Sequence, residues 1–353
     1  MNILFVISSL NYGGAEKQTV IDANLLSSSN NVFLIAFNDG PQKEQLKEKV
    51  HYIQLSKNGY IQTAKKLADI CRKNSIKVIH TSLFAPSIIS AISTIYYKTN
   101  LVWYFHSHEY DIPTYSKVAF VFFARFNTVK KIFFVSLELR DFLSRRFFLP
   151  KRKLGILYNT TSFVKEFNAV KKDSSKIIIG YVGRLVELKR VKYLVDLTEY
   201  LIAKKHENFE VWIVGNGEEM KNLQKSIEMK NLVDYIKLLG FHKETQKYYA
   251  KFDIFILPSR EECLSIALID AITSGVPSLA FDVGGNNEII KHNENGFIVK
   301  NKEELFEKAE LLIENSSLRT MFSTKALNIS NSKFSQISRS ETLNKISKDV
   351  LKT

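Results

Sequence analysis

Short apolar runs alternate along this chain with longer segments in which apolar residues recur every three or four positions. The runs predict strands buried on both faces, and the longer segments predict helices that cover a parallel sheet. In the first half of the chain the predicted strands are residues 3–8, 32–37, 51–55, 77–80, 101–105 and 131–135, and the helical patterns include 15–28 and 61–74. The order of these elements predicts a doubly wound α/β fold.

A polar stretch at residues 163–175, which lacks apolar periodicity, interrupts the pattern and predicts a linker. Beyond it the alternation resumes, with predicted strands at 176–181, 210–214, 236–239, 254–257, 278–281 and 296–299 and helices at 191–204, 220–230 and 265–273. We therefore expect one Rossmann-like domain over residues 1–165, a second over residues 176–335, and a helical tail over residues 336–353. Open α/β sheets bind ligands beyond the carboxyl ends of their strands, so the loops there, facing a cleft between the domains, are expected to carry the chemistry.

Composition narrows the possible classes of protein. With 45% apolar and 12% aromatic residues among 353, the chain is too rich in core-forming residues to be disordered or fibrous. Its formal net charge of +14 favours anionic partners, and no nucleic-acid-binding motif accompanies that charge. Cys71 and Cys263 fit neither a disulfide framework nor a zinc site. No apolar run approaches the roughly 18–20 residues of a membrane span, and the start of the chain lacks a signal peptide, so we expect a cytoplasmic protein.

Two predicted loops of the first domain carry candidate binding residues. Gly13 and Gly14 follow the first strand and open a helix, where glycine lets a ligand approach the backbone and free N–H groups attract an anion. His106 and His108, followed by Glu109, come after a later strand. An imidazole there would transfer a proton near neutral pH or bind a sugar hydroxyl. Structural roles in packing are the alternative for both pairs, and a metal would need a third ligand that is not evident in the sequence.

The loop after the first strand of the second domain contains Gly183, Arg184 and, five residues further on, Lys189. The two cations suit a diphosphate, since arginine offers a planar fork of donors and lysine a compact charge. A solvated loop with ordinary surface charges is the alternative. The Gly-x-Gly at residues 215–217 lacks the third glycine of a dinucleotide fingerprint, which disfavours an oxidoreductase.

The most informative segment is residues 258–271, which leaves a strand and enters a helix. Glu262 lies by the first helical turn and Asp270 two turns further on, so they are at most ~12 Å apart along the helix axis. That separation resembles the one between the ribose of a nucleotide and a sugar attached through its diphosphate, with the amides of the helix start between them for the phosphates. A helix cap is the alternative for Glu262, and a surface charge is the alternative for Asp270. A further glycine-rich turn, ending in Glu288, follows the next strand in the same manner.

Five motifs occur in a fixed order along the chain. They are Gly13-Gly14-Ala15-Glu16, Gly183-Arg184-Leu185 with Lys189, Pro258-Ser259 with Glu262 and Asp270, Gly275-Val276-Pro277, and Gly284-Gly285 with Glu288. Together they resemble glycosyltransferase family 4. The resemblance implies a GT-B fold, in which two Rossmann-like domains face a cleft and the C-terminal one holds a nucleotide-sugar donor. It also implies transfer with retention of anomeric configuration, without a metal or other cofactor, to a saccharide or lipid-linked acceptor in cell-surface polysaccharide or glycolipid synthesis.

The resemblance also implies roles for individual residues. The implied donor contacts are Arg184 and Lys189 for the diphosphate, Glu262 with Cys263, Leu264 and Ser265 for the sugar, Asp270 for the ribose, and Gly183 and Glu288 beside them. The loop of Gly13 and Gly14 would approach the diphosphate from the other domain. His106 resembles a histidine that lines the acceptor side, and His108 is the competing assignment.

The chain also departs from the family pattern. Asp270 replaces the usual glutamate, residues 263–265 replace a Gly-Phe-Gly, and Arg190 replaces the glycine that usually follows the lysine. We interpret these departures as divergence within an active enzyme. Two other functions stay open: a nucleotide-sugar epimerase of the same architecture, and a non-catalytic sugar-nucleotide-binding subunit.

Residues 114–153 contain ten Lys or Arg, two acidic residues and ten aromatic residues. A basic aromatic face of this kind would dock on an anionic lipid surface and bring a lipid-linked acceptor to the enzyme. The alternative is that the aromatic residues belong to the core and the cations to a solvated rim.

Overall fold

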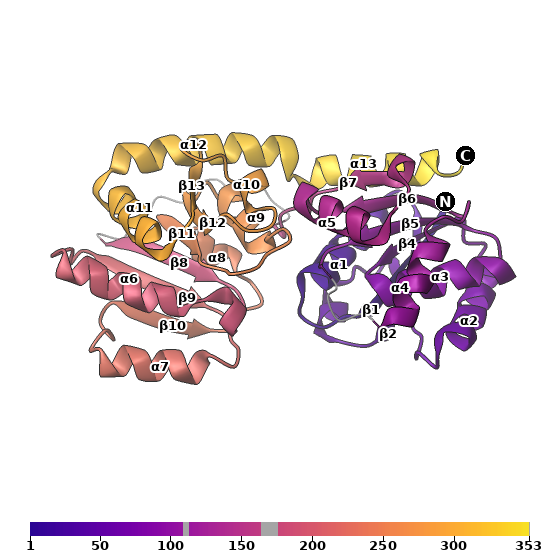
Figure 1. Ribbon diagram of the computed structural model, residues 1–353, viewed down its shortest axis with the longest axis horizontal. Helices are drawn as coiled ribbons and strands as arrows, with labels where there is room; N and C mark the ends of the chain where they lie inside the picture. The colour runs from indigo at the N-terminus through magenta and orange to yellow at the C-terminus, as the bar shows by residue number, and fades with distance from the viewer. Residues whose placement is uncertain (109–112, 164–175, 353) are drawn as a thin grey trace. The chain divides into compact units, whose positions relative to one another are not determined.

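The computed structural model describes residues 1–108, 113–163 and 176–352, and it consists of two compact units. Unit 1 comprises Met1–Ser162 together with Gln336–Thr353, and unit 2 comprises Phe163–Ser335. Each unit is built on one parallel sheet flanked by helices (Figure 1). The predicted linker lies, apart from its first residue, outside the described residues.

Unit 1 contains a seven-stranded sheet in the order β3-β2-β1-β4-β5-β6-β7. Its strands are β1 (Asn2–Ser9), β2 (Asn31–Asn38), β3 (Val50–Gln54), β4 (Val78–Ser82), β5 (Asn100–Phe105), β6 (Val129–Phe134) and β7 (Leu154–Ile156). Its helices are α1 (Gly14–Leu26), α2 (Tyr60–Lys73), α3 (Phe84–Tyr96), α4 (Thr114–Phe123), α5 (Leu137–Phe147) and α13 (Gln336–Asp349), with 3-10 turns η1 (Pro41–Gln45) and η2 (Lys151–Lys153).

Unit 2 contains a six-stranded sheet in the order β10-β9-β8-β11-β12-β13. Its strands are β8 (Ile177–Val182), β9 (Phe209–Val214), β10 (Ile236–Gly240), β11 (Ile254–Leu257), β12 (Ser278–Phe281) and β13 (Gly296–Val299). Its helices are α6 (Lys192–Ala203), α7 (Met220–Met229), α8 (Gln246–Tyr249), α9 (Ile266–Thr273), α10 (Asn286–Ile289), α11 (Lys302–Glu314) and α12 (Ser316–Lys333), and η3 (Glu187–Lys189) precedes α6.

The predicted α/β class is confirmed, because every strand expected from the apolar runs is formed and every strand pair of both sheets is parallel. The apolar runs identify these strands because their side chains are buried in both directions, as in the fully buried core of β1. The sequence analysis missed β7, a half-buried edge strand of three residues. Such a strand is too short to produce a recognisable apolar run.

Both sheets reverse their strand order next to their first strand. In unit 1, β1 lies between β2 and β4, and in unit 2, β8 lies between β9 and β11. Crossovers on the two sides of such a strand run in opposite directions, so the loops beyond its carboxyl end part and leave a crevice where open sheets bind ligands. The topology therefore draws attention to the loops that follow β1, β4, β8 and β11.

Helix α13 packs on unit 1 through a buried ion pair. Arg339 donates from Nε and Nη2 to the two carboxylate oxygens of Asp22 on α1, at 2.9 and 2.6 Å, and both side chains are almost fully buried. The remaining donors of Arg339 reach the carbonyl oxygens of Leu157 and Tyr158. Further along α13, Ser347 hydrogen bonds to Nε2 of the buried His80 on β4. These contacts attach the end of the chain to the first sheet.

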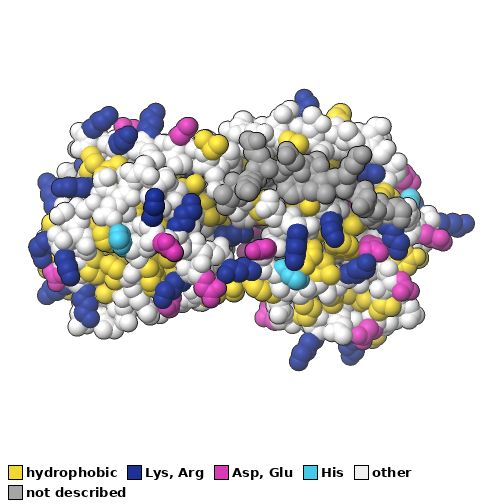
Figure 2. All heavy atoms as spheres, turned by 180° about the vertical axis from the view of Figure 1, so that it is seen from behind, with side chains coloured by type: hydrophobic (Ala, Val, Ile, Leu, Met, Phe, Trp, Pro, Cys, Tyr) yellow, Lys and Arg dark blue, Asp and Glu magenta, His cyan; other side chains and the backbone are white. Residues whose placement is uncertain are grey.

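The surface carries much of the positive charge of the chain. Lys and Arg side chains are spread over both units on the face drawn in Figure 2, with apolar side chains exposed between them. Among the described residues, no helix is both long and apolar enough to cross a bilayer.

We predict that Arg339→Leu lowers the free energy of unfolding by about 3–5 kcal/mol, because it leaves the buried Asp22 carboxylate without its charged partner. Urea denaturation followed by circular dichroism measures this change. The double variant Asp22→Leu/Arg339→Leu removes both charges and is expected to recover part of the loss. A single variant as stable as the wild type would mean that the ion pair does not hold α13.

Candidate active site

Glu262 lies at the centre of the loops that meet at the strand reversal of unit 2. Its Oε1 accepts hydrogen bonds from Nζ of Lys189 at 2.5 Å and from Oγ of Ser259 at 2.8 Å. Lys189 ends η3, in the loop that follows β8, whereas Ser259 and Glu262 belong to the loop that follows β11. The backbone N–H of Arg260 also donates to the carbonyl of Leu188 at 2.8 Å, so the two loops are joined through side chains and backbone.

The glycine-rich turn after β12 packs directly against the backbone of Glu262. A Cβ on Gly284 would lie 1.7 Å from the carbonyl oxygen of Glu262, and the φ of Gly284 is +55°. The N–H of Gly285 donates to the carbonyl of Cys263 at 3.0 Å. Only glycine allows this close backbone approach, so the turn fixes the main chain of Glu262 and Cys263.

The loop after β9 supports the loop of Arg184 in the same way. A Cβ on Gly215 would lie 1.8 Å from the carbonyl oxygen of Gly183, and one on Gly217 would lie 2.3 Å from that of Leu185. The Gly-x-Gly at residues 215–217 therefore serves packing between two loops. This explains why it needs no third glycine.

Arg184 is exposed, and among the described residues it makes no ion pair. Its carbonyl oxygen accepts a hydrogen bond from the hydroxyl of Tyr181, whose ring is buried under the loop. Burial and the charge of Glu262 raise the pKa of Tyr181, and the charge of Arg184 lowers it, so both charged groups act on this one phenol. Arg184, Lys189 and Glu262 thus lie around the carboxyl ends of β8 and β11.

Asp270 is 1% exposed, so the interpretation of this residue as a surface charge is wrong. It lies on α9, one turn beyond the helix start, where the hydroxyl of Ser265 caps the helix by accepting from the N–H of Leu268. Burial, and secondarily the Asp270 carboxylate, raise the pKa of Tyr249, which places Asp270 beside a buried phenol. Because Ser265 is the cap, the capping role considered for Glu262 is also wrong.

The remaining predicted residues of unit 2 flank this set. Leu264 is buried, and Cys263 is partly exposed in the same loop. Glu288 on α10 is 8% exposed, and its carbonyl oxygen accepts from Nζ of Lys333. Cys263 and Leu264 follow the carboxyl end of β11, and Glu288 follows that of β12.

Arg190 adopts a left-handed backbone conformation, with φ +47° and ψ +36°. This accounts for the glycine that the family pattern has here, since glycine takes such angles without steric strain. Its guanidinium lies over the rings of Tyr193 and Phe281, at 5.6 and 5.8 Å from their centroids. The side chain therefore links the Lys189 loop to the end of β12 and offsets part of the strain.

In unit 1, Gly13 precedes α1 at the carboxyl end of β1. A Cβ on Gly13 would lie 2.2 Å from Oε2 of Glu16, whose other oxygen accepts from the hydroxyl of Ser9 at 3.3 Å. The start of α1 at Gly14 therefore already faces a carboxylate of its own helix. An anionic ligand would have to displace Glu16 from this helix terminus.

The two candidate histidines have different surroundings. Burial, followed by the charge of Arg339, lowers the pKa of His106 to about 3, so its imidazole is neutral at physiological pH. It can exchange hydrogen bonds there, but it does not take up the second proton of an imidazolium near neutral pH. His108 instead contacts the carboxylate of Glu138 through Nε2, at 3.0 and 3.1 Å. Glu109, the third member of the predicted cluster, lies outside the described residues.

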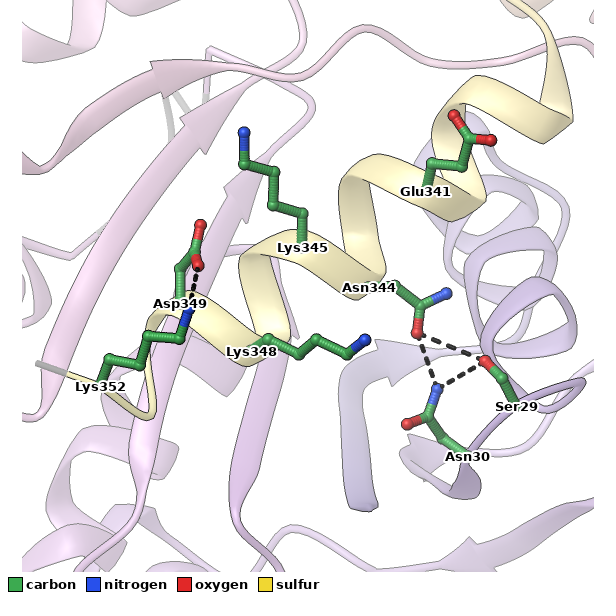
Figure 3. Close-up of a pocket in the computed structure, with 8 residues that line it drawn as sticks. All are labelled: Ser29, Asn30, Glu341, Asn344, Lys345, Lys348, Asp349 and Lys352. Atoms are coloured by element: carbon green, nitrogen blue, oxygen red, sulfur yellow. Dashed lines mark hydrogen bonds and ion pairs between the residues drawn. The ribbon is translucent and has the colours of Figure 1, made fainter.

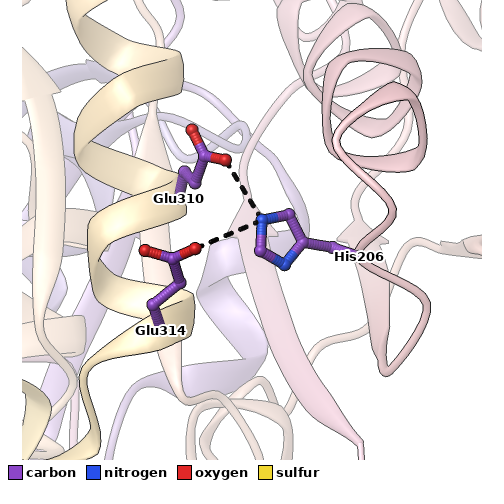
Figure 4. Close-up of side chains that lie close together, drawn as sticks. All are labelled: His206, Glu310 and Glu314. Atoms are coloured by element: carbon purple, nitrogen blue, oxygen red, sulfur yellow. Dashed lines mark hydrogen bonds and ion pairs between the residues drawn. The ribbon is translucent and has the colours of Figure 1, made fainter.

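Two other features lie at the opposite ends of the strands. A hollow of about 640 Å³ between α13 and the turn before β2 is lined by Ser29, Asn30, Glu341, Asn344, Lys345, Lys348, Asp349 and Lys352 (Figure 3). Before β9, Nε2 of His206 contacts Glu310 at 3.1 Å and Glu314 at 3.7 Å, both on α11 (Figure 4). We interpret this group as polar contacts that attach α11 to the turn, remote from the loops around Glu262.

We predict that Arg190→Ala is less stable than Arg190→Gly by about 1 kcal/mol, because alanine keeps the strain of the left-handed backbone and glycine relieves it. Both variants lose the contacts with the two rings, so their difference isolates the backbone. Urea midpoints at an unchanged slope measure it. Equal midpoints would contradict this explanation of the position.

Two family models match adjoining parts of the chain. Glycosyltransferase Family 4 matches residues 12–162, and Glycosyl transferases group 1 matches residues 162–328. An uncharacterized glycosyltransferase of Haemophilus influenzae is 26% identical over 337 residues, which cover 91% of this chain and 93% of that protein.

A second relative, from Campylobacter jejuni, is N-acetylgalactosamine-N,N'-diacetylbacillosaminyl-diphospho-undecaprenol 4-alpha-N-acetylgalactosaminyltransferase. It is 26% identical to this chain, and the match covers 91% of this chain and 92% of that protein. Among solved structures, HepE of Anabaena in complex with UDP-glucose matches with a TM-score of 0.84 at 20% identity, covering 99% of this chain and all of that one. The predicted GT-B fold is thereby confirmed. On the family matches, with which the strand order and the loop glycines agree, the chain belongs to glycosyltransferase family 4, among the group 1 glycosyl transferases.

Proposed function

We propose that unit 2 binds a nucleotide-diphosphate sugar through the loops around Glu262, and that the enzyme transfers the sugar with retention of configuration. The observation that carries this proposal is the convergence of Lys189, Ser259 and the Gly284 turn on Glu262 at the strand reversal. Charged groups held rigidly at such a crevice suit a ligand with a charged centre and polar rings on either side.

In this proposal the exposed guanidinium of Arg184 and the ammonium of Lys189 bind the diphosphate, together with Gly183 and the N–H groups at the start of α9. Lys189 contacts Glu262 in the structure described above, so one cation would join the sugar site to the phosphate site. Glu262, with Cys263, Leu264, Ser265 and Glu288 around it, would hold the sugar hydroxyls. Asp270 would accept hydrogen bonds from the ribose.

The comparisons support the nature of both substrates. HepE was solved with UDP-glucose, and the relative from Campylobacter jejuni acts on a diphospho-undecaprenol-linked sugar, as its name states. We infer that this chain uses a nucleotide-sugar donor of the hexosyl type and an acceptor that is a saccharide or a lipid-linked saccharide. Such a reaction belongs to cell-surface polysaccharide or glycolipid synthesis.

The reaction follows from the charges. The bond between the anomeric carbon and the diphosphate oxygen breaks, and its electron pair leaves with the diphosphate. Arg184, Lys189 and the helix amides stabilise the developing negative charge, a role for which positioned cations suffice without a metal. The acceptor hydroxyl bonds to the anomeric carbon on the same face, and its proton passes to the departing phosphate oxygen.

For unit 1 we propose acceptor binding at the carboxyl ends of β1 and β5. His106, neutral at physiological pH, would exchange hydrogen bonds with an acceptor hydroxyl, and the proton would be taken up by the leaving phosphate. Gly13 and Gly14 would approach the donor diphosphate. His108, which contacts Glu138, is the competing acceptor contact. We also propose that the protein works at the cytoplasmic face of a membrane, where lipid-linked acceptors are found.

We predict that Arg184→Met lowers kcat/KM for sugar transfer by about 100-fold, since it removes one positioned charge that stabilises the leaving diphosphate. The loss is expected in kcat as well as in KM, because the charge on the diphosphate grows in the transition state. Transfer measured by release of the nucleoside diphosphate in the presence of a saccharide acceptor gives both constants.

The matched control is Arg72→Met, which removes an exposed arginine from α2 in unit 1 and is expected to leave transfer unchanged. Unchanged transfer by Arg184→Met would argue strongly against the mechanism. Product analysis without acceptor tests the alternative functions: isomerised nucleotide sugar would indicate an epimerase, and donor binding without turnover across many acceptors would indicate a binding subunit.

We further predict that one nucleotide sugar in a panel raises the thermal midpoint of the protein more than the others, because a ligand that binds only the folded state stabilises it by mass action. Asp270→Ala is expected to lower the affinity for that nucleotide sugar by about 10-fold or more, since it removes a hydrogen bond to a charged group. Differential scanning fluorimetry over a range of ligand concentrations gives the apparent affinity. An affinity that Asp270→Ala leaves unchanged would exclude the ribose role.

A further inference from the structure

The aromatic residues of the segment at 114–153 include a buried group and an exposed group, and Phe123, Phe126, Phe133 and Phe142 are intermediate between them. Phe120, Phe134 and Phe147 are buried in the core: Phe120 packs with Trp103 and Phe105 of β5, Phe134 with Phe105, and Phe147 with Phe120. Other apolar side chains of the same segment are exposed: Tyr115 by 69%, Val118 by 66%, Phe122 by 59% and Phe148 by 78%. The interpretation of these aromatic residues as core therefore holds for the first group, and the exposed group needs another explanation.

Three of the exposed apolar residues share one helix, and the backbone of the fourth is linked to the end of that helix. Tyr115, Val118 and Phe122 are three and four positions apart on α4, so they lie along one side of that helix. Phe148 follows α5, but Arg125 joins it to the end of α4, donating to the carbonyls of Phe148 and Val121 at 2.9 and 2.6 Å. We call these four residues the α4 face.

Phe148 is notable because its backbone is left-handed, with φ +48°, at the position that ends α5. Glycine or asparagine usually takes this position, since a larger side chain is strained there. A phenylalanine at this position gains no burial in return, because its ring is exposed. A solvent-facing ring held in this way is expected where the ring contacts another surface.

Several cations lie near the end of α4. Nζ of Lys153 donates to the carbonyls of Ala124 and Phe126 at the end of α4, and Arg152, Lys130 and Arg125 lie near enough to act on its charge. Within the described part of the segment, the acidic residues Glu138 and Asp141 already contact His108 and Arg140. Nine cations of the segment have no ion pair with the described residues: Lys117, Arg125, Lys130, Lys131, Arg145, Arg146, Lys151, Arg152 and Lys153.

We propose that the α4 face docks on an anionic lipid bilayer, with its four apolar side chains entering the headgroup region and the surrounding cations pairing with lipid phosphates. Charge selects this partner: the face would repel a second copy of itself, whereas an anionic membrane attracts it. This inference rests on the proposed function for its purpose, the delivery of a lipid-linked acceptor to unit 1. The docking itself requires no donor.

The test is sedimentation of the full chain with vesicles. We expect the wild type to bind vesicles of equal parts phosphatidylglycerol and phosphatidylcholine, to leave vesicles of phosphatidylcholine alone unbound, and to bind less as salt is raised. Phe122→Ser/Phe148→Ser is expected to lower the partition coefficient by about 10-fold or more, and Lys130→Gln/Arg152→Gln to lower the preference for the anionic lipid. A matched control, Ile61→Ser/Met229→Ser, removes two exposed apolar side chains elsewhere and is expected to bind like the wild type.

Absence of binding to anionic vesicles at moderate salt would overturn the proposal, and so would binding that the α4 variants leave unchanged. Self-association of the wild type that Phe122→Ser/Phe148→Ser abolishes, without vesicle binding, would assign the face to a second copy and also overturn it. The thermal shift with a nucleotide sugar, measured on every variant, verifies folding. It also separates the two proposals. A retained thermal shift without vesicle binding refutes only the membrane docking, and vesicle binding without any thermal shift refutes only the donor site.

Discussion

The ion pair between Lys189 and Glu262 is the interaction on which the rest of unit 2 depends. It joins the loop after β8 to the loop after β11, the two strands between which the sheet reverses its order. Both side chains are largely shielded from solvent, so their attraction is stronger than that of a surface pair. The hydroxyl of Ser259 donates to the same carboxylate oxygen, so three groups from two loops meet at one point.

Glycines make this arrangement possible at some positions and are dispensable at others. Gly284 admits no side chain, because a Cβ there would overlap the carbonyl oxygen of Glu262. At Arg190 the constraint is only the backbone angle, and the side chain has space beside Tyr193 and Phe281. A larger residue can therefore replace glycine where the constraint is only a left-handed backbone angle. It cannot replace glycine where a Cβ would overlap a neighbouring backbone atom.

Much of the fold could be predicted, because strands buried on both faces appear as continuous apolar runs. The short strand β7 and the burial of Asp270 could not, since neither leaves a local pattern: the first has three residues, and the second is a charged residue on a helix. The attachment of α13 to unit 1 was equally hidden, because Arg339 and Asp22 are 317 positions apart. The candidate residues after β8 and β11 were found because parallel strands end at one edge of the sheet.

The sequence by itself determined the α/β class, the two successive sheets and the loops that bear the charged residues, because each of these depends on local periodicity and on residue order. The tertiary structure alone decided which charges meet. Lys189 reaches Glu262 across 73 positions, His106 is neutral because of the burial around it, and the aromatic residues near α4 divide between core and surface. Such outcomes depend on distances between segments remote in the chain, and these distances are set when the sheets assemble.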